Sequence, residues 1–229
     1  MTTHLTWLGH ATWLVETGSH SIVLDPFLDE SPSATRKSKD IAADFVLVSH
    51  GHFDHVADAA TIASRTQATV ISNYEICQWL AGQGVKNTLG MNIGGSASLP
   101  FGRVKLTLAL HSSQLPDGAY GGNPGGFLLT LNAGPTIYFA CDTGLFGDMQ
   151  LIGAAGIDLA VLPIGDLFTM GPDDAVEATK LIAPRRVVAS HYNTWPPIAQ
   201  DVEQWAARIR AETKAEPIVM RPGETISVL

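Results

Sequence analysis

Short apolar runs recur along the whole chain, and they restrict its fold more than any other feature. Each run has about four to eight residues between Gly, Pro, Asn or Asp, which is typical of β-strands. The expected strands cover residues 5–8, 12–16, 22–24, 45–49, 69–72, 104–110, 127–131, 136–140, 159–163 and 187–190. Between the later runs, apolar residues at helical spacing predict helices at 56–65, 74–83, 172–183 and 198–212.

The order of these elements predicts the fold class. In each half of the chain, several strands in succession precede strands that alternate with helices. We therefore expect an α/β fold made of two fused halves, an αββα sandwich of two mixed β-sheets with helices on the outer faces. No stretch has the Pro, Gly and Ser content of a linker, so residues 1–229 are expected to form one domain.

Composition excludes several classes of protein. The 45% of apolar residues rules out a disordered chain, and the net charge of −8 argues against a nucleic-acid partner. Cys77 and Cys141 lie too far apart for a paired-cysteine zinc site, so we expect free, buried thiols. No signal peptide or apolar membrane span is evident, which predicts a cytoplasmic protein without a membrane partner. The sequence does not determine the oligomeric state, and a homo-oligomer is one of the alternatives.

A dense group of metal-binding side chains follows the expected strand at 45–49. It reads His50-Gly51-His52-Phe53-Asp54-His55. On a helix the three imidazoles and the carboxylate would not share a face, but in an irregular loop at a strand end they can converge, and Gly51 permits a tight path. Imidazole and carboxylate ligands suit zinc, manganese, iron or nickel.

Three further ligand-type residues each follow an expected strand directly. His111 comes after 104–110, Asp142 after 136–141 and His191 after 187–190. Each alone is weak evidence, because polar residues often end strands. Together with the loop they complete a set for two metal ions at one edge of the sheets.

These ligands and their surroundings resemble the metallo-β-lactamase superfamily. The resemblance extends over nearly the whole chain and is strongest to the branch of metal-dependent hydrolases related to ascorbate-6-phosphate lactonase. The similar segments are Trp7-Leu8-Gly9-His10-Ala11-Thr12, Leu24-Asp25-Pro26-Phe27-Leu28, His111-Ser112-Ser113, Asp142-Thr143-Gly144-Leu145-Phe146-Gly147-Asp148-Met149, Pro163-Ile164-Gly165, Phe168-Thr169-Met170-Gly171-Pro172 and His191-Tyr192-Asn193-Thr194. Cys141 stands where the family more often has Gly.

The resemblance implies the metallo-β-lactamase fold and a role for each ligand. His50, His52 and His111 would hold one divalent ion, Asp54, His55 and His191 the second, and Asp142 would bridge them. Zinc is the expected metal, with manganese, nickel and iron as alternatives. A bridging hydroxide would then attack the substrate, with Asp54 and Asp142 as catalytic carboxylates.

Other residues are expected to support this chemistry. By the resemblance, Asp25 supports the ligand loop, although an Asp before Pro26 is also a common turn residue. His10 binds substrate, protonates a leaving group or is a structural histidine. Residues expected to line the substrate pocket are Ser112, Ser113, Tyr192 and Asn193, with Trp195 beside them. Arg36, Lys37 and Lys39 form either an anion-attracting loop or a solvated one.

The predicted function is hydrolysis of a small ester, lactone or phosphodiester. One alternative is a mononuclear iron dioxygenase of the same fold, although diiron members carry Glu where this chain has His52. The other is a metal-binding module without catalysis. The chain lacks the basic stripe of a nuclease, so the expected partner is a small-molecule substrate.

Overall fold

The computed structural model describes residues 2–132 and 134–228, and these form two seven-stranded sheets. The strands of the first sheet, in spatial order, are β14 (Thr225–Val228), β1 (Thr3–Gly9), β2 (Thr12–Glu16), β3 (Ser21–Leu24), β4 (Phe45–Leu47), β5 (Thr69–Asn73) and β6 (Thr88–Met91). Those of the second are β13 (Glu216–Ile218), β12 (Arg186–Ser190), β11 (Leu159–Pro163), β10 (Thr136–Phe139), β9 (Gly125–Leu131), β8 (Gly102–Leu108) and β7 (Ser96–Leu99). Each sheet has antiparallel pairs on one side and parallel pairs on the other.

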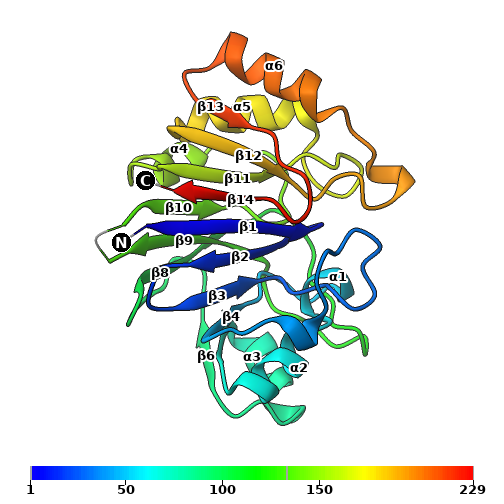
Figure 1. The fold of residues 1–229 in the computed structure, drawn as a ribbon. Helices are drawn as coiled ribbons and strands as arrows, with labels where there is room; N and C mark the ends of the chain where they lie inside the picture. Colours follow the sequence, from blue (N-terminus) through cyan, green and yellow to red (C-terminus); the bar gives the residue numbers. More distant parts are fainter. Residues whose placement is uncertain (1, 133, 229) are drawn as a thin grey trace.

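Helices cover the outer faces of both sheets (Figure 1). On the first sheet lie α1 (Phe53–Val56), α2 (Ala59–Thr66) and α3 (Tyr74–Gly82); on the second lie α4 (Met149–Gly153), α5 (Pro172–Ile182) and α6 (Val202–Glu212). Two short 3-10 turns are η1 (Ser38–Asp40) and η2 (Pro196–Ile198). The predicted αββα sandwich is confirmed.

Alternation along the strands builds two apolar cores. On β2, Trp13 and Val15 belong to the core between the sheets, where Phe127 of the second sheet also lies. Leu14 points the other way and packs in the cluster that holds Ile62 of α2. A strand whose two faces are both covered must be apolar on both, which is why β2 has three consecutive apolar residues, from Trp13 to Val15.

Two expected helices differ from the structure. The helix expected at 56–65 is divided, because the Asp58 carboxylate accepts hydrogen bonds from the backbone N–H groups of Leu28 (2.6 Å) and Asp29 (3.1 Å) between α1 and α2. The helix expected at 198–212 begins at Val202, where the Asp201 side chain caps it. Strands β6, β7, β13 and β14 were not expected, since they are short and only partly buried.

Cys77 is a buried free thiol, as expected, whereas Cys141 is free and half-buried. Burial favours the protonated thiol of Cys77 and raises its pKa from 9.0 to about 11. The folded protein therefore loses stability relative to the unfolded chain as pH rises from about 9 to about 11. At about pH 8.5 we expect iodoacetamide to alkylate Cys77 at least ~10-fold more slowly in native protein than in guanidinium chloride. Peptide mass spectrometry measures this, and equal rates would contradict the buried position.

Candidate metal centre

The seven expected ligands meet at one end of the sandwich, although they come from both sheets. His50 to His55 follow β4, His111 follows β8, Asp142 follows β10 and His191 follows β12. The carboxyl ends of parallel strands share an edge, and stacking the two sheets brings both edges together.

One group of ligand atoms is made only of imidazoles. His50 Nε2 lies 2.9 Å from His52 Nδ1, and His111 Nε2 lies 3.2 Å from the same atom. The three ligand atoms are all within 4.8 Å of one another. The Ser49 hydroxyl, 2.9 Å from His50 Nδ1, engages that nitrogen and leaves Nε2 facing the group.

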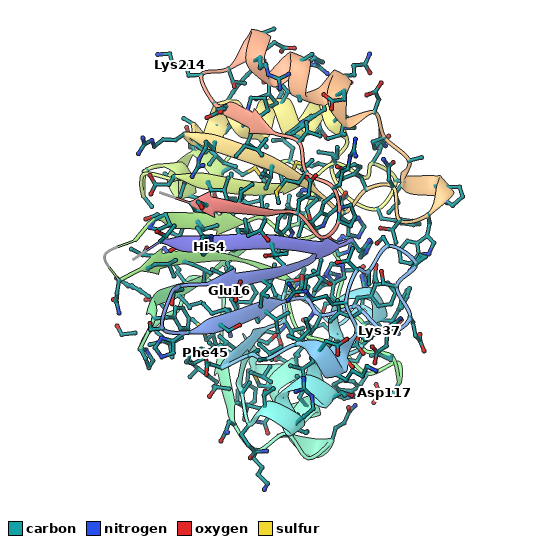
Figure 2. The ribbon with its side chains drawn as sticks, in the orientation of Figure 1. His4, Glu16, Lys37, Phe45, Asp117 and Lys214 are labelled. Carbon is teal, nitrogen blue, oxygen red and sulfur yellow. The ribbon has the colours of Figure 1, made fainter. Side chains whose placement is uncertain are left out.

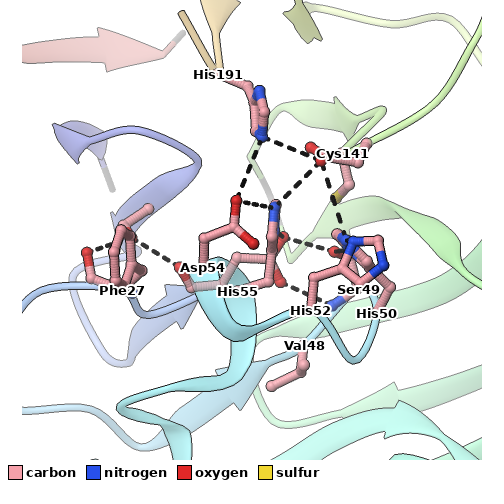
Figure 3. A network of polar contacts seen from close by, with 12 residues as sticks. Phe27, Val48, Ser49, His50, His52, Asp54, His55, Cys141 and His191 are labelled. Atoms are coloured by element: carbon pink, nitrogen blue, oxygen red, sulfur yellow. Dashed lines mark hydrogen bonds and ion pairs between the residues drawn. The ribbon is translucent and has the colours of Figure 1, made fainter. Parts of the chain in front are cut away.

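A second group is centred on Asp54, His55 and His191, with His10 beside them. Asp54 Oδ2 lies 3.8 Å from the Nε2 atoms of both His55 and His191. Figure 3 shows Asp54, His55 and His191 converging on one point.

Asp142 lies between the two groups. Its Oδ2 atom is 3.1 Å from Nε2 of His191 and 3.3 Å from that of His55. The same oxygen is 3.6 Å from Nε2 of His111 and 4.0 Å from that of His50. A single carboxylate therefore faces imidazoles of both groups, as a bridging ligand would.

The residues fit a pair of divalent ions. The atoms of this cluster that are buried without a hydrogen-bond partner include His55 Nε2, His191 Nε2 and Asp142 Oδ1. Leaving such atoms unpaired costs about 1–3 kcal/mol each, and cation coordination would satisfy them. Imidazole nitrogens and carboxylate oxygens are also the donors that zinc prefers.

Electrostatics differ between the two groups. Burial, reinforced by His55, holds the pKa of His50 well below its usual value, and burial also lowers the pKa values of His52 and His111. These imidazoles are therefore neutral, which is the form that binds metal. Burial acts in the same direction on His191, but Asp142 outweighs it and raises the pKa of His191 to about 9.

The carboxylates of the site stay ionised for a related reason. Burial alone would raise the pKa values of Asp54 and Asp142. Nearby His55 and His191 outweigh burial and hold both pKa values well below the usual range.

Asp25 fixes the ligand loop from behind. Its Oδ1 accepts the backbone N–H of Ser49 at 2.7 Å, and its Oδ2 accepts the Ser49 hydroxyl at 2.6 Å and His55 Nδ1 at 2.8 Å. These bonds set which nitrogen of His55 faces the centre.

We expect Asp25→Asn to weaken metal binding by about 10–100-fold, because an amide cannot accept all three hydrogen bonds. Zinc titration against a competing chelator measures the affinity. Asp40→Asn, at an exposed carboxylate away from the site, is the matched control. An affinity equal to the wild type would show that the loop holds its geometry without Asp25.

His10 is completely buried beside this centre. Its Nε2 lies 3.0 Å from Asp54 Oδ2, and its Nδ1 lies 2.7 Å from the Thr194 hydroxyl. Burial, together with His191, lowers the pKa of His10 to about 4, so the ring is neutral and donates from Nε2 to Asp54. With both nitrogens engaged, His10 positions Asp54. This geometry favours the structural alternative for His10, and its expected role in binding substrate or protonating a leaving group stays a prediction.

Left-handed backbone conformations cluster around the centre. The φ angles are 51° for His10, 44° for Asp25, 55° for Cys141 and 54° for His191. Such angles strain residues other than Gly, and that strain is typical of functional sites. Cys141 is one of these residues, and Gly would adopt the same angle there without strain.

A pocket of about 490 Å³ opens above the candidate ligands. Of the residues expected there, Ser112 lines it with its hydroxyl 3.3 Å from His52 Nε2, and Trp195 also lines it. Sequence reasoning missed Phe53, Phe168 and Pro197, which form much of the remaining wall. Phe53 lies inside the ligand loop, and that position could have indicated that it lines the pocket.

Three residues expected in the pocket lie outside it, which corrects that expectation. The Ser113 hydroxyl accepts a hydrogen bond from the Gly51 backbone N–H instead. Tyr192 is buried and stacks on Trp7 at 5.3 Å, and Asn193 accepts a hydrogen bond from the backbone N–H of Gln200. Tyr192 and Asn193 line a separate cavity of about 340 Å³.

The basic loop is not part of the pocket. Lys37 donates to the backbone carbonyls of Leu28 and Asp29, and Figure 2 shows it on the outside of the molecule. Neither Arg36 nor Lys39 lines the pocket. In the part of the chain that the structure describes, no helix has the length and apolarity needed to cross a bilayer.

Comparisons with known proteins identify the family of this chain. The model of the Beta-lactamase superfamily domain matches residues 20–192. A UPF0173 metal-dependent hydrolase from Pelotomaculum thermopropionicum is 48% identical over 98% of this chain and 99% of its own length. A UPF0173 metal-dependent hydrolase from Thermus thermophilus is 46% identical over 96% of each chain.

Solved structures extend the comparison. Igni18, a metallo hydrolase from the archaeon Ignicoccus hospitalis, is 38% identical, with a TM-score of 0.90 over 99% of this chain and 98% of its own. An isothiocyanate hydrolase from Delia radicum gut bacteria is 20% identical, with a TM-score of 0.78 over 99% of this chain and 100% of its own, and shares the fold. This chain therefore belongs to the metallo-β-lactamase superfamily, among the UPF0173 metal-dependent hydrolases.

Proposed function

We propose that this protein is a hydrolase that uses two divalent metal ions, zinc first among the candidates, to cleave a small ester, lactone or phosphodiester. The observation that carries the proposal is the position of Asp142, whose Oδ2 atom faces the Nε2 atoms of His191 and His111 from the two ligand groups at 3.1 and 3.6 Å. Two cations need an anion between them to lie at about 3.5–4 Å.

The bound ions would lower the pKa of water and polarise the substrate oxygen. The protein side chains then hold the reacting groups in place. Asp54 lines the pocket, and its pKa lies well below its usual range, so we assign it to orienting water rather than to storing a proton. His10 donates a hydrogen bond to Asp54 and is itself held by Thr194. Once a substrate covers them, the apolar walls would exclude bulk water from the reaction.

Metal analysis and a substrate panel test the proposal together. We expect about two ions per chain in protein purified without chelator. When the panel has identified an ester, lactone or phosphodiester that the protein hydrolyses, removing metal with a chelator should abolish that hydrolysis. Adding zinc should restore it. One iron per chain with oxygen uptake would favour the dioxygenase alternative, and a loaded protein that turns over no substrate would favour a non-catalytic metal module.

A further inference from the structure

The pocket above the candidate ligands has walls and a floor of different character. Its floor is polar, because it is formed by candidate ligands such as His52, His111 and Asp142. Its walls are apolar and include Phe53, Phe168, Trp195 and Pro197. Reacting atoms would therefore lie against the ligands, while the rest of a substrate would contact aromatic rings.

Two of the rings form a preorganised wall. Phe27, which is buried, lies edge-on to Phe53 with ring centroids 5.7 Å apart, and its centroid is 6.0 Å from that of Trp195. Phe53 comes from α1 and Trp195 from the turn before η2, so Phe27 braces rings from two distant segments. Such aromatic contacts hold the wall in place before any ligand arrives.

Two of the aromatic rings that line the pocket are largely exposed, which indicates that the pocket binds an apolar ligand. Phe53 is 53% exposed and Phe168 is 56% exposed, although both line the pocket. Neighbouring large apolar side chains left open to water around a cavity are typical of ligand-binding surfaces. An apolar group placed between them would remove that surface from water.

Away from the candidate ligands, the described residues of the pocket offer no cationic side chain to a charged substrate group. Among the described residues that line it, none is Lys or Arg. Lys37, on the basic loop outside the pocket, donates to the carbonyls of Leu28 and Asp29. A phosphate or carboxylate away from the reacting centre would lose its hydration against aromatic rings without a partner, which is unfavourable.

We infer that the pocket takes a neutral carboxylic ester or lactone whose remaining part is an uncharged aromatic or compact aliphatic group. The inference rests on the proposed hydrolase function and narrows it to substrates that carry no charged group away from the reacting centre. In the reaction, the oxygen of water bonds to the carbonyl carbon and the bond from that carbon to the leaving oxygen breaks. The proton released by water ends on the leaving oxygen.

Binding of hydroxamates to zinc-loaded protein tests the inference without turnover. Hydroxamates carry the same metal-binding group on different substituents, and calorimetry measures their affinities. We expect benzohydroxamate to bind at least about 10-fold more tightly than acetohydroxamate, because its ring is buried against the wall. The monohydroxamate of succinic acid should bind no more tightly than acetohydroxamate, since its carboxylate finds no cation.

A matched pair of variants ties the preference to the wall. Phe168→Ala should lower the ratio of benzohydroxamate to acetohydroxamate affinity at least about 3-fold. Tyr74→Ala, which removes a ring that is 58% exposed on α3 and outside the pocket, should leave the ratio unchanged. Because Phe168 is exposed, its loss is not expected to unfold the protein.

The outcomes separate the two proposals. Absence of acetohydroxamate binding to the zinc-loaded protein would overturn the metal centre, and the inference with it. Binding of acetohydroxamate together with tighter binding of the succinic acid derivative, or with no tighter binding of benzohydroxamate, would overturn only the apolar substrate class. An unchanged affinity ratio in Phe168→Ala would likewise overturn that class while the metal centre stands.

Discussion

Asp142→Ala is expected to lower the metal content from about two ions per chain to one or fewer and to reduce hydrolysis at least about 10³-fold. The variant removes the one carboxylate whose oxygen lies within 4.0 Å of four imidazole nitrogens from both ligand groups. Without it the two cations would repel each other across the centre. Elemental analysis and initial rates on a substrate from the panel measure the two effects.

Two variants sharpen this experiment. Asp174→Ala removes an exposed carboxylate on α5 and should retain full metal content and activity. Asp142→Asn keeps the side-chain shape and loses the charge, so it should lose activity as well if charge is what the centre needs. Full metal content and activity in Asp142→Ala would mean that the two groups do not share this residue.

Trp13→Ala is expected to destabilise the protein by about 3–5 kcal/mol. Trp13 is fully buried between the sheets and stacks on Trp7 with ring centroids 5.8 Å apart. Its Nε1 donates to the Ser190 hydroxyl at 3.0 Å, and that hydroxyl donates to the His10 carbonyl at 3.2 Å. The truncation thus removes both core packing and a hydrogen bond at the end of β12.

Thermal and urea unfolding of Trp13→Ala measure this loss. A chain of this size loses about 2–4 °C of melting temperature per kcal/mol, so a fall of about 6–20 °C is expected. Tyr74→Ala, at an exposed ring, should change the unfolding free energy by no more than about 0.5 kcal/mol. If Trp13→Ala unfolds within about 1 kcal/mol of the wild type, the core between the sheets is not packed as described.

The strand pattern determined much of the fold. Both faces of the central strands are covered, so neighbouring residues along a strand are buried on opposite sides. Consecutive residues such as Val23 and Leu24 must therefore both be apolar. The edge strands were not predicted, because they are only partly buried and need fewer apolar residues. Strand β6 contains Gly90 and is only partly buried, so hydrogen bonding to β5 rather than its own apolar content makes it a strand.

The metal-ligand set could be predicted from the sequence because its members either lie close together in one loop or follow the ends of strands. The loop from His50 to His55 concentrates metal-binding groups by itself, and strand ends mark His111 and His191. The role of His10 was not readable in the same way. It depends on Thr194, which lies far along the chain and meets His10 only when the two sheets stack.

The sequence by itself therefore determined the two-sheet architecture, the strand ends that carry chemistry and the residue types available for metal. Only the tertiary structure decided which neighbours serve the site. It buried Tyr192 against Trp7 and brought Phe53, Phe168 and Trp195 to one pocket. The physical reason is that periodicity and ligand chemistry are local properties of a chain, whereas pocket walls and hydrogen-bond partners depend on contacts between segments that are distant in sequence.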